Sequence, residues 1–152
     1  MEKRKFLNQE IKREGVGELR IGMDFNLFQK NFLKPEFFYY DKIVEMNAVY
    51  PSNVTFTFFN SICCWIDIES STLERIDLFN DFTGMFQKKI SLGKKLDCIK
   101  ELKLPLIFDE DCVQIFNDWS VSLIVDEDLT ILDSVEEMYN SNIEMITIKK
   151  VD

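Results

Sequence analysis

The chain contains no histidine, and this absence excludes several kinds of functional site. Without an imidazole there is no Ser-His-Asp triad, no Cys-His pair and no histidine-ligated metal centre. Neither of the spacings typical of a phosphate-binding loop, G-x-x-x-x-G-K-S/T and G-x-G-x-x-G, occurs among its five glycines. We therefore expect a protein that is not an enzyme and that needs no cofactor.

Cysteine is sparse and is not arranged for zinc. Cys63 and Cys64 are adjacent, Cys98 and Cys112 stand apart, and no C-x-x-C spacing exists. This arrangement is typical of buried free thiols in a reducing compartment. The chain also lacks an apolar segment after its basic start, and no run of about 18 apolar residues could span a bilayer. We expect a cytoplasmic protein.

Hydrophobic residues, in contrast, are abundant. The 152-residue chain is 46% hydrophobic and holds 14 phenylalanines, with only three prolines. A chain of this length buries roughly two-thirds of its unfolded surface when it folds. The composition therefore predicts a single domain over residues 1–152, with a large aromatic core.

The charge of the chain is unevenly distributed. The net charge is −9, yet residues 1–104 hold 16 basic and 15 acidic side chains. Residues 105–152 hold 12 acidic side chains and two basic ones, Lys149 and Lys150. A segment of like charges must be well solvated or meet a basic partner, and it disfavours nucleic acid and anionic membranes as partners.

A short pattern occurs twice, 71 residues apart. Leu19–Phe28 and Ile90–Ile99 both contain an apolar strand end, a glycine (Gly22 and Gly93) and then an amphipathic stretch. We interpret the pattern as a structural repeat. It divides the chain into half-repeats at 17–86 and 87–152, which follow a flexible start at 1–16.

Periodicity assigns the remaining elements. In the first half, Asp24 is expected to cap a helix that buries Phe25, Phe28 and Phe32 and stops at Pro35. From residue 36 to residue 86 the period changes to two, as in an antiparallel meander. The strands expected there are at 43–46, 54–58, 62–68 and 73–79.

The second half repeats this order. A helix is expected from Leu96 to Leu102, and a helical turn at 133–139 capped by Asp133 or Ser134. Strands are expected at 112–116, 121–125, 129–132 and 145–151, and the Lys149–Lys150 pair of the last would protect a sheet edge. The fold class is therefore α+β, an antiparallel sheet with helices packed on one face, built from two strand–helix–meander repeats.

The segments Ile21-Gly22-Met23 and Leu92-Gly93-Lys94, with their following helices, resemble the tandem α+β repeat of β-lactamase-inhibitor proteins and of outer-membrane assembly lipoproteins. A lipoprotein itself is not expected, since neither lipobox nor signal precedes the domain. In size, acidity and aromatic content, most of the chain resembles immunity proteins of bacterial toxin systems. That resemblance implies a protein that binds a cognate toxin, often a basic nuclease, and blocks its active site.

The densest acidic clusters are Asp109-Glu110-Asp111 and Asp126-Glu127-Asp128. Adjacent acids point to opposite faces of a strand, so both clusters are better placed in loops. The second cluster departs from the EF-hand pattern because Ile131 stands where glycine is needed, although Glu137 falls at the twelfth position. Metal binding or general acid–base catalysis, a solvated loop, and recognition of a partner are the alternatives.

Aromatic residues near the acidic clusters favour recognition. Phe116, Trp119 and Tyr139 lie close to them in sequence, and an aromatic side chain ringed by carboxylates suits a hot spot against a basic partner. The alternative is that Phe116 belongs to the core and that Trp119 caps a hairpin. Trp65, inside an apolar run, is expected in the core.

We therefore expect an immunity or inhibitor protein that binds and neutralises a basic toxin domain through its C-terminal acidic surface. One alternative is a small-ligand-binding or regulatory module with a pocket between the two halves, and another is a carboxylate hydrolase that needs a divalent metal. The expected partner-binding residues are Asp109, Glu110, Asp111, Phe116, Asp118, Trp119, Asp126, Glu127, Asp128, Asp133, Glu136 and Glu137.

Overall fold

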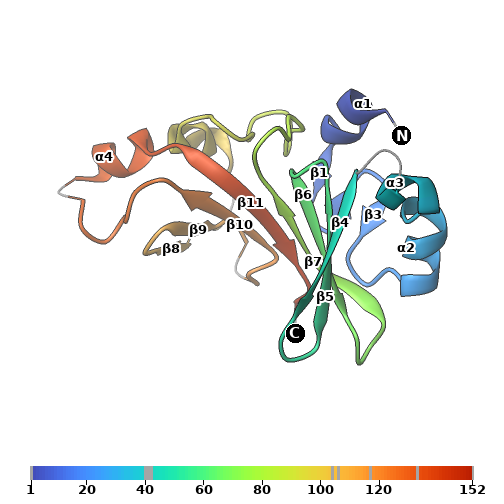
Figure 1. Cartoon of the computed structure of the whole chain (residues 1–152). Helices are drawn as coiled ribbons and strands as arrows, with labels where there is room; N and C mark the ends of the chain where they lie inside the picture. The colour runs from blue at the N-terminus through green and yellow to red at the C-terminus, as the bar shows by residue number, and fades with distance from the viewer. Residues whose placement is uncertain are drawn as a thin grey trace.

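The computed structural model describes residues 2–39, 43–103, 105, 107–116, 118–132 and 134–151. Its main element is an eight-stranded antiparallel sheet in the order β4-β5-β6-β7-β11-β10-β9-β8 (Figure 1). The α+β fold expected from the sequence is therefore confirmed. The strands are β4 (Val44–Val49), β5 (Asn53–Phe58), β6 (Ile62–Asp67), β7 (Thr72–Leu78), β8 (Ile107–Asp109), β9 (Cys112–Gln114), β10 (Val121–Val125) and β11 (Ile143–Lys149).

Short helices and a small sheet complete the chain. A three-stranded sheet has the order β1-β2-β3 near the N-terminus. The small elements are α1 (Lys3–Leu7), β1 (Ile11–Lys12), β2 (Gly15–Val16), β3 (Leu19–Arg20), α2 (Phe25–Phe32), α3 (Pro35–Tyr39), the 3₁₀-helix η1 (Leu96–Glu101) and α4 (Val135–Asn140).

The repeated sequence pattern forms the same hydrogen bonds in both halves. The Gly22 amide donates to the Leu73 carbonyl at 2.7 Å, and the Gly93 amide donates to the Ile143 carbonyl at 2.9 Å. Leu73 and Ile143 donate back to the residues after those glycines, each at 2.9 Å. Both glycines have positive φ, 87° and 81°, a region that favours glycine. Each half thus ties its glycine turn to the start of its last strand.

These last strands, β7 and β11, pair with each other in the middle of the sheet. Each half contributes a four-stranded meander, and the two meanders meet along this pair with opposite directions (Figure 1). Asp77 faces Thr147 across it, and these residues stand 70 positions apart, as do Leu73 and Ile143. The pseudo-twofold axis that relates the two meanders therefore passes between Asp77 and Thr147.

One face of the sheet carries the core. Phe58 is fully buried there, and the rings of Phe6 in α1 and Phe28 in α2 lie 5.4 and 6.2 Å from its ring. In the second half, Leu96 and Ile99 of η1 are fully buried in the same core. Because strand side chains alternate between faces, the polar residues between these core positions form the opposite face.

Local expectations for α2 and α4 are confirmed. The Asp24 side chain accepts a hydrogen bond from the Asn26 amide and caps α2. Ser134 caps α4 by accepting one from the Glu137 amide. Asp133, the other residue expected to cap this helix, lies outside the described residues.

Three other expectations are wrong. The start at 1–16 is not loose, since α1, β1 and β2 bury Phe6, Leu7 and Ile11. Residues 129–132 form no strand. The helix expected from Leu96 to Leu102 is present as the 3₁₀-helix η1 and buries Leu96 and Ile99. The helix expected to stop at Pro35, α2, does end before it, at Phe32, and Pro35 itself begins α3, consistent with the preference of proline for a first helical turn.

The third error concerns the Lys149–Lys150 pair. The strand that holds Lys149, β11, lies at the centre of the sheet instead of at an edge. The edge strands are β4 and β8, and β8 was not expected from the sequence. Lys149 and Lys150 therefore do not protect an edge.

Within the described residues, no helix is long and apolar enough to cross a membrane.

Candidate binding site

A buried carboxylate, that of Asp77, lies at the centre of the sheet on the face opposite to the core, which we call the open face. Asp77 is only 5% exposed. It accepts hydrogen bonds of 2.8 Å from Trp65 Nε1, Arg75 Nε and Thr147 Oγ1. A buried charge is tolerated where it is paired and hydrogen-bonded, and these three donors satisfy Asp77. The same bonds fix the orientation of Trp65 and Arg75.

Two cations beside Asp77 stack on tryptophan rings. The Arg75 guanidinium lies 4.9 Å from the centre of the Trp65 ring, and Lys149 Nζ lies 5.6 Å from that of Trp119. Both distances are within the range of a cation–π interaction. Arg75 and Lys149 are also direct partners in the pairing of β7 with β11. Two positive charges therefore stand side by side on the open face.

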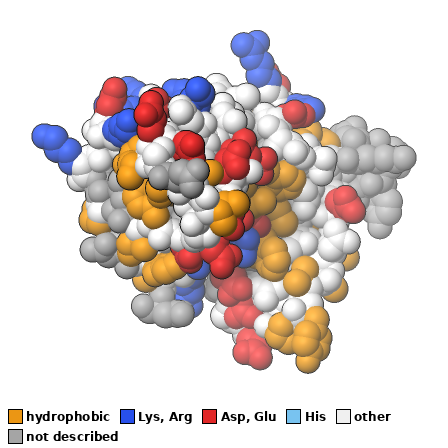
Figure 2. Space-filling view, turned by 90° about the vertical axis from the view of Figure 1, so that its left-hand side faces the viewer, with side chains coloured by type: hydrophobic (Ala, Val, Ile, Leu, Met, Phe, Trp, Pro, Cys, Tyr) orange, Lys and Arg blue, Asp and Glu red, His pale blue; other side chains and the backbone are white. Residues whose placement is uncertain are grey.

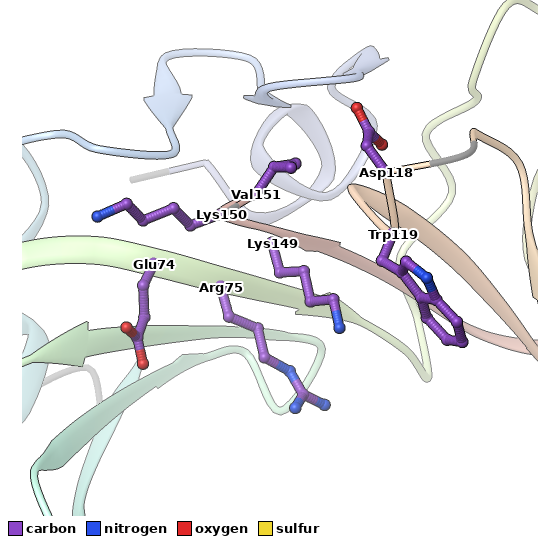
Figure 3. Close-up of a pocket in the computed structure, with 7 residues that line it drawn as sticks. All are labelled: Glu74, Arg75, Asp118, Trp119, Lys149, Lys150 and Val151. Atoms are coloured by element: carbon purple, nitrogen blue, oxygen red, sulfur yellow. The ribbon is translucent and has the colours of Figure 1, made fainter.

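A hollow of about 700 Å³ lies next to these cations. Figure 3 shows Arg75 and Lys149 pointing the same way from neighbouring strands, with the Trp119 ring beside the end of Lys149. The hollow takes residues from both halves of the chain. Its lining residues are Glu74, Arg75, Asp118, Trp119, Lys149, Lys150 and Val151.

Asp118 is engaged by the N-terminal part of the chain. Arg13, in the turn between β1 and β2, forms an ion pair with Asp118 and covers the Phe116 ring at 4.2 Å. Hydrogen bonding by Ser120, together with the Arg13 guanidinium, lowers the pKa of Asp118 to about 2. These contacts hold the turn that presents Trp119.

The two acidic clusters lie next to each other at the far end of β9 and β10. Glu110 and Asp111 form the turn between β8 and β9. The Val125 amide donates to the Asp111 carbonyl at 2.8 Å, and the Leu129 amide donates to the Glu110 carbonyl. The chain therefore brings the two clusters together at one corner of the sheet.

Three of these carboxylates serve the local structure. Asp126 accepts from the backbone amide and the side-chain amide of Asn142 at 2.8 and 2.9 Å. Asp128 accepts from the Thr130 amide and hydroxyl, and Asp109 from the Glu110 amide. Hydrogen bonding by Asn142 lowers the pKa of Asp126, and hydrogen bonding by Thr130 lowers that of Asp128.

Exposed hydrophobic side chains surround these acids. Ile131 is 72% exposed and Val135 is 65% exposed, while Ile107 and Phe108 of the edge strand β8 are more than a third exposed. The Phe108 ring packs edge-on against Tyr139 of α4 at 6.2 Å. We call Ile107–Asp111, Asp126–Ile131 and Val135–Asn140 together the acidic end. Figure 2, which faces this side of the molecule, shows acidic side chains in separate groups among hydrophobic and uncharged ones.

The structure separates the expected site residues into two places. The acidic end holds Asp109, Glu110, Asp111, Asp126, Glu127, Asp128, Glu136 and Glu137, whereas Phe116, Asp118 and Trp119 lie at the other end of β10. The five residues of β10 span about 17 Å. Phe116 is half-buried under Arg13 and packs against the core, in agreement with the alternative that it is a core residue. Asp133 lies outside the described residues.

Sequence reasoning missed the central residues Asp77, Arg75 and Lys149. Trp65 was expected in the core, but its ring is partly exposed on the open face. The Trp65-Arg75-Asp77 group depends on the pairing of β6 with β7 and of β7 with β11. The signal available was alternation, since Trp65, Arg75 and Asp77 all occupy polar-face positions of their strands.

Among the described residues, no group of three or more cysteine or acidic side chains could hold a metal ion. All four cysteines are free. Burial raises the pKa of each thiol above its ordinary value, most of all for the fully buried Cys64. The described part of the site therefore offers surfaces for binding, with no activated nucleophile among its thiols.

Comparisons of the chain with protein-family models, with curated proteins and with solved structures find no match.

Proposed function

We propose that this chain is an inhibitor of the immunity-protein type, which binds a basic protein domain through its acidic end. The observation that carries the proposal is the set of exposed hydrophobic side chains, Ile107, Phe108, Ile131 and Val135, standing among carboxylates. Exposed apolar groups rimmed by polar ones mark interaction surfaces. Their burial would supply affinity, and the surrounding charges would select a basic partner.

The position of β8 supports a protein partner. β8 is an edge strand, and all three of its residues are exposed. An uncovered edge strand presents unpaired backbone groups that another chain can use. The contact between Phe108 of β8 and Tyr139 joins this edge to α4, with Lys100 Nζ 4.4 Å from the Tyr139 ring. Rigid aromatic groups of this kind make good anchors at interfaces.

The carboxylates of the acidic end fall into two groups that an experiment can separate. Asp109, Asp126 and Asp128 accept hydrogen bonds that shape the turns. Four exposed acids, in contrast, have side chains with no hydrogen bond or ion pair to another described residue, and they are Glu110, Asp111, Glu127 and Glu136. Because the second group makes none of these contacts, we expect its replacement to leave the fold intact and to report on binding.

The test is co-expression with the products of neighbouring genes, above all a secreted effector with a basic C-terminal domain. Such a product should arrest growth when expressed alone and should be tolerated when this chain is present. Replacing Glu110, Asp111, Glu127 and Glu136 by lysine should abolish this tolerance, because the reversed charges repel a basic partner by several kcal/mol.

The control reverses the same number of acids elsewhere. Glu2, Glu10, Glu36 and Glu69 are exposed and lie outside the acidic end, and their replacement by lysine should leave protection intact. The proposal is contradicted if the native chain protects against none of these products. It is also contradicted if the acidic-end variant and the control variant protect equally well.

A further inference from the structure

We propose that the hollow beside Arg75 and Lys149, the central hollow, binds a ligand through a carboxylate group. This site lies on the open face of the sheet and is distinct from the acidic end. It goes beyond the proposed function, because its chemistry is of the opposite sign. It also occupies the place between the two halves where the alternative expectation put a ligand pocket.

The charges that line the central hollow are unbalanced toward positive. Its two carboxylates already have partners, since Glu74 accepts from the Asn53 side chain and Asp118 is paired with Arg13. Arg75 forms an ion pair with Asp77, which also accepts hydrogen bonds from Trp65 and Thr147. Lys149 and Lys150 form no ion pair with any described residue. A chain of net charge −9 thus places three cations and two carboxylates around one hollow, and one of these carboxylates, Asp118, is already paired with Arg13.

The strand register adds a second argument. Arg75 and Lys149 face each other directly in the pairing of β7 with β11, so their Cβ atoms lie about 5 Å apart. Like charges directly opposite each other destabilise a sheet. An anion placed between the two side chains removes this repulsion and makes a contact with each. The arrangement is unfavourable alone and favourable with a carboxylate bound.

The Arg75 guanidinium is held ready for such a ligand. Its Nε donates to Asp77 at 2.8 Å and its plane stacks on Trp65, while neither Nη atom has a partner among the described residues. Two adjacent N–H donors in a fixed plane match the two oxygens of a carboxylate. Because Asp77 is buried and fully hydrogen-bonded, little freedom is lost when the ligand binds.

A carboxylate ligand fits the surroundings better than a nucleic acid. A nucleic acid would be repelled by a chain of net charge −9, since its affinity depends on neutralising many phosphates at once. The central hollow offers the Arg75 and Lys149 side chains, which point the same way in Figure 3, and Trp119, which is 41% exposed. Its volume of about 700 Å³ suits a small organic acid or a short acidic peptide segment.

The experiment follows the indole signals of the two tryptophans by nuclear magnetic resonance. The ¹⁵N-labelled chain is titrated with acetyl-tetraglutamate amide and, in a separate arm, with succinate. Binding should move the Trp119 indole signal, which is assigned with a Trp119→Phe variant. Lys149→Gln should weaken the binding of the carboxylate by about tenfold. The arm with the higher affinity identifies the peptide or the free acid as the source of the carboxylate.

The matched control is Lys30→Gln, which removes one positive charge from an exposed position on α2 and should leave the affinity unchanged. Three results would overturn the proposal. They are an unmoved Trp119 signal at about 10 mM of either ligand, equal weakening by Lys149→Gln and Lys30→Gln, and tighter binding of inorganic phosphate or octathymidylate at the same signal.

Discussion

Asp77 and Thr147 occupy equivalent positions in the two halves of the chain, and Thr147 Oγ1 donates a 2.8 Å hydrogen bond to Asp77 Oδ1. The bond crosses the line on which the two meanders meet. Both residues are 5% exposed, although they lie on the face of the sheet opposite to the core. The equivalent positions hold a carboxylate and a hydroxyl, and this difference supplies the acceptor that orients Trp65 and Arg75.

Asp77→Ala should lower the free energy of unfolding by about 3 kcal/mol, because it leaves Trp65 Nε1 and Thr147 Oγ1 without their acceptor in a buried place. Urea denaturation followed by tryptophan fluorescence measures the change. Thr147→Val removes one donor alone and should cost about 1 kcal/mol. Equal costs for the two variants would show that Asp77 does not organise the group.

Gly22→Ala and Gly93→Ala should each cost about 1 kcal/mol. An added Cβ meets nothing within 4 Å at either glycine, but the φ values of 87° and 81° strain any other residue. Thermal or urea unfolding of the single variants and of the double variant measures the costs, which should add. A cost at one glycine only would argue against equivalent roles in the two halves.

Removal of the Asp118 charge should have an effect that depends on pH. The pKa of this carboxyl is lowered from 3.8 to about 2 by hydrogen bonding from Ser120 and by Arg13. A lowered pKa in the folded state stabilises the fold above the unfolded pKa, and the contribution is lost as the pH falls through the folded pKa. The native chain should therefore exceed Asp118→Asn in stability at neutral pH. The difference should shrink between about pH 4 and pH 2.

Stability curves of the two proteins at several pH values test this expectation. An Asp118 carboxyl that titrates near its ordinary value of 3.8 would contradict it, as would a stability difference that stays constant down to about pH 2.

The four free thiols should react slowly with a disulfide reagent at pH 7. Burial raises the pKa of Cys63, Cys64, Cys98 and Cys112, so little of each is present as the reactive thiolate. Comparison of reaction rates in the native chain and in urea measures the protection. The fully buried Cys64 should be the slowest. A fast native thiol with a pKa below that of free cysteine would contradict this account.

The sequence predicted the parts of the fold that depend on local pattern. Alternation located β5, β6, β7 and β10, and the Asp24 cap located α2. The glycine pattern at Gly22 and Gly93 predicted two similar turns, because left-handed turns leave a clear trace in sequence. The sequence could not show that β7 and β11 pair, since register between distant strands is set by packing of the whole sheet.

The site was harder to predict for the same reason. Lys149 was interpreted as protecting an edge, because only the strand order reveals that its strand is central. Phe116 and Trp119 were grouped with the acidic clusters on sequence distance, yet β10 separates the two groups. Phe108, which has a carboxylate neighbour and an exposed ring, lay in a strand too short for periodicity to detect.

The central claim is that the acidic end is the surface that contacts a basic partner. Hydrogen–deuterium exchange of the chain, alone and in complex with the basic toxin domain proposed as its partner, tests it most directly. The account predicts slower exchange in the complex at 107–111, 126–131 and 135–140, with unchanged exchange in β4 and β5. Slower exchange confined to the first half of the chain, with the acidic end unaffected, would contradict it.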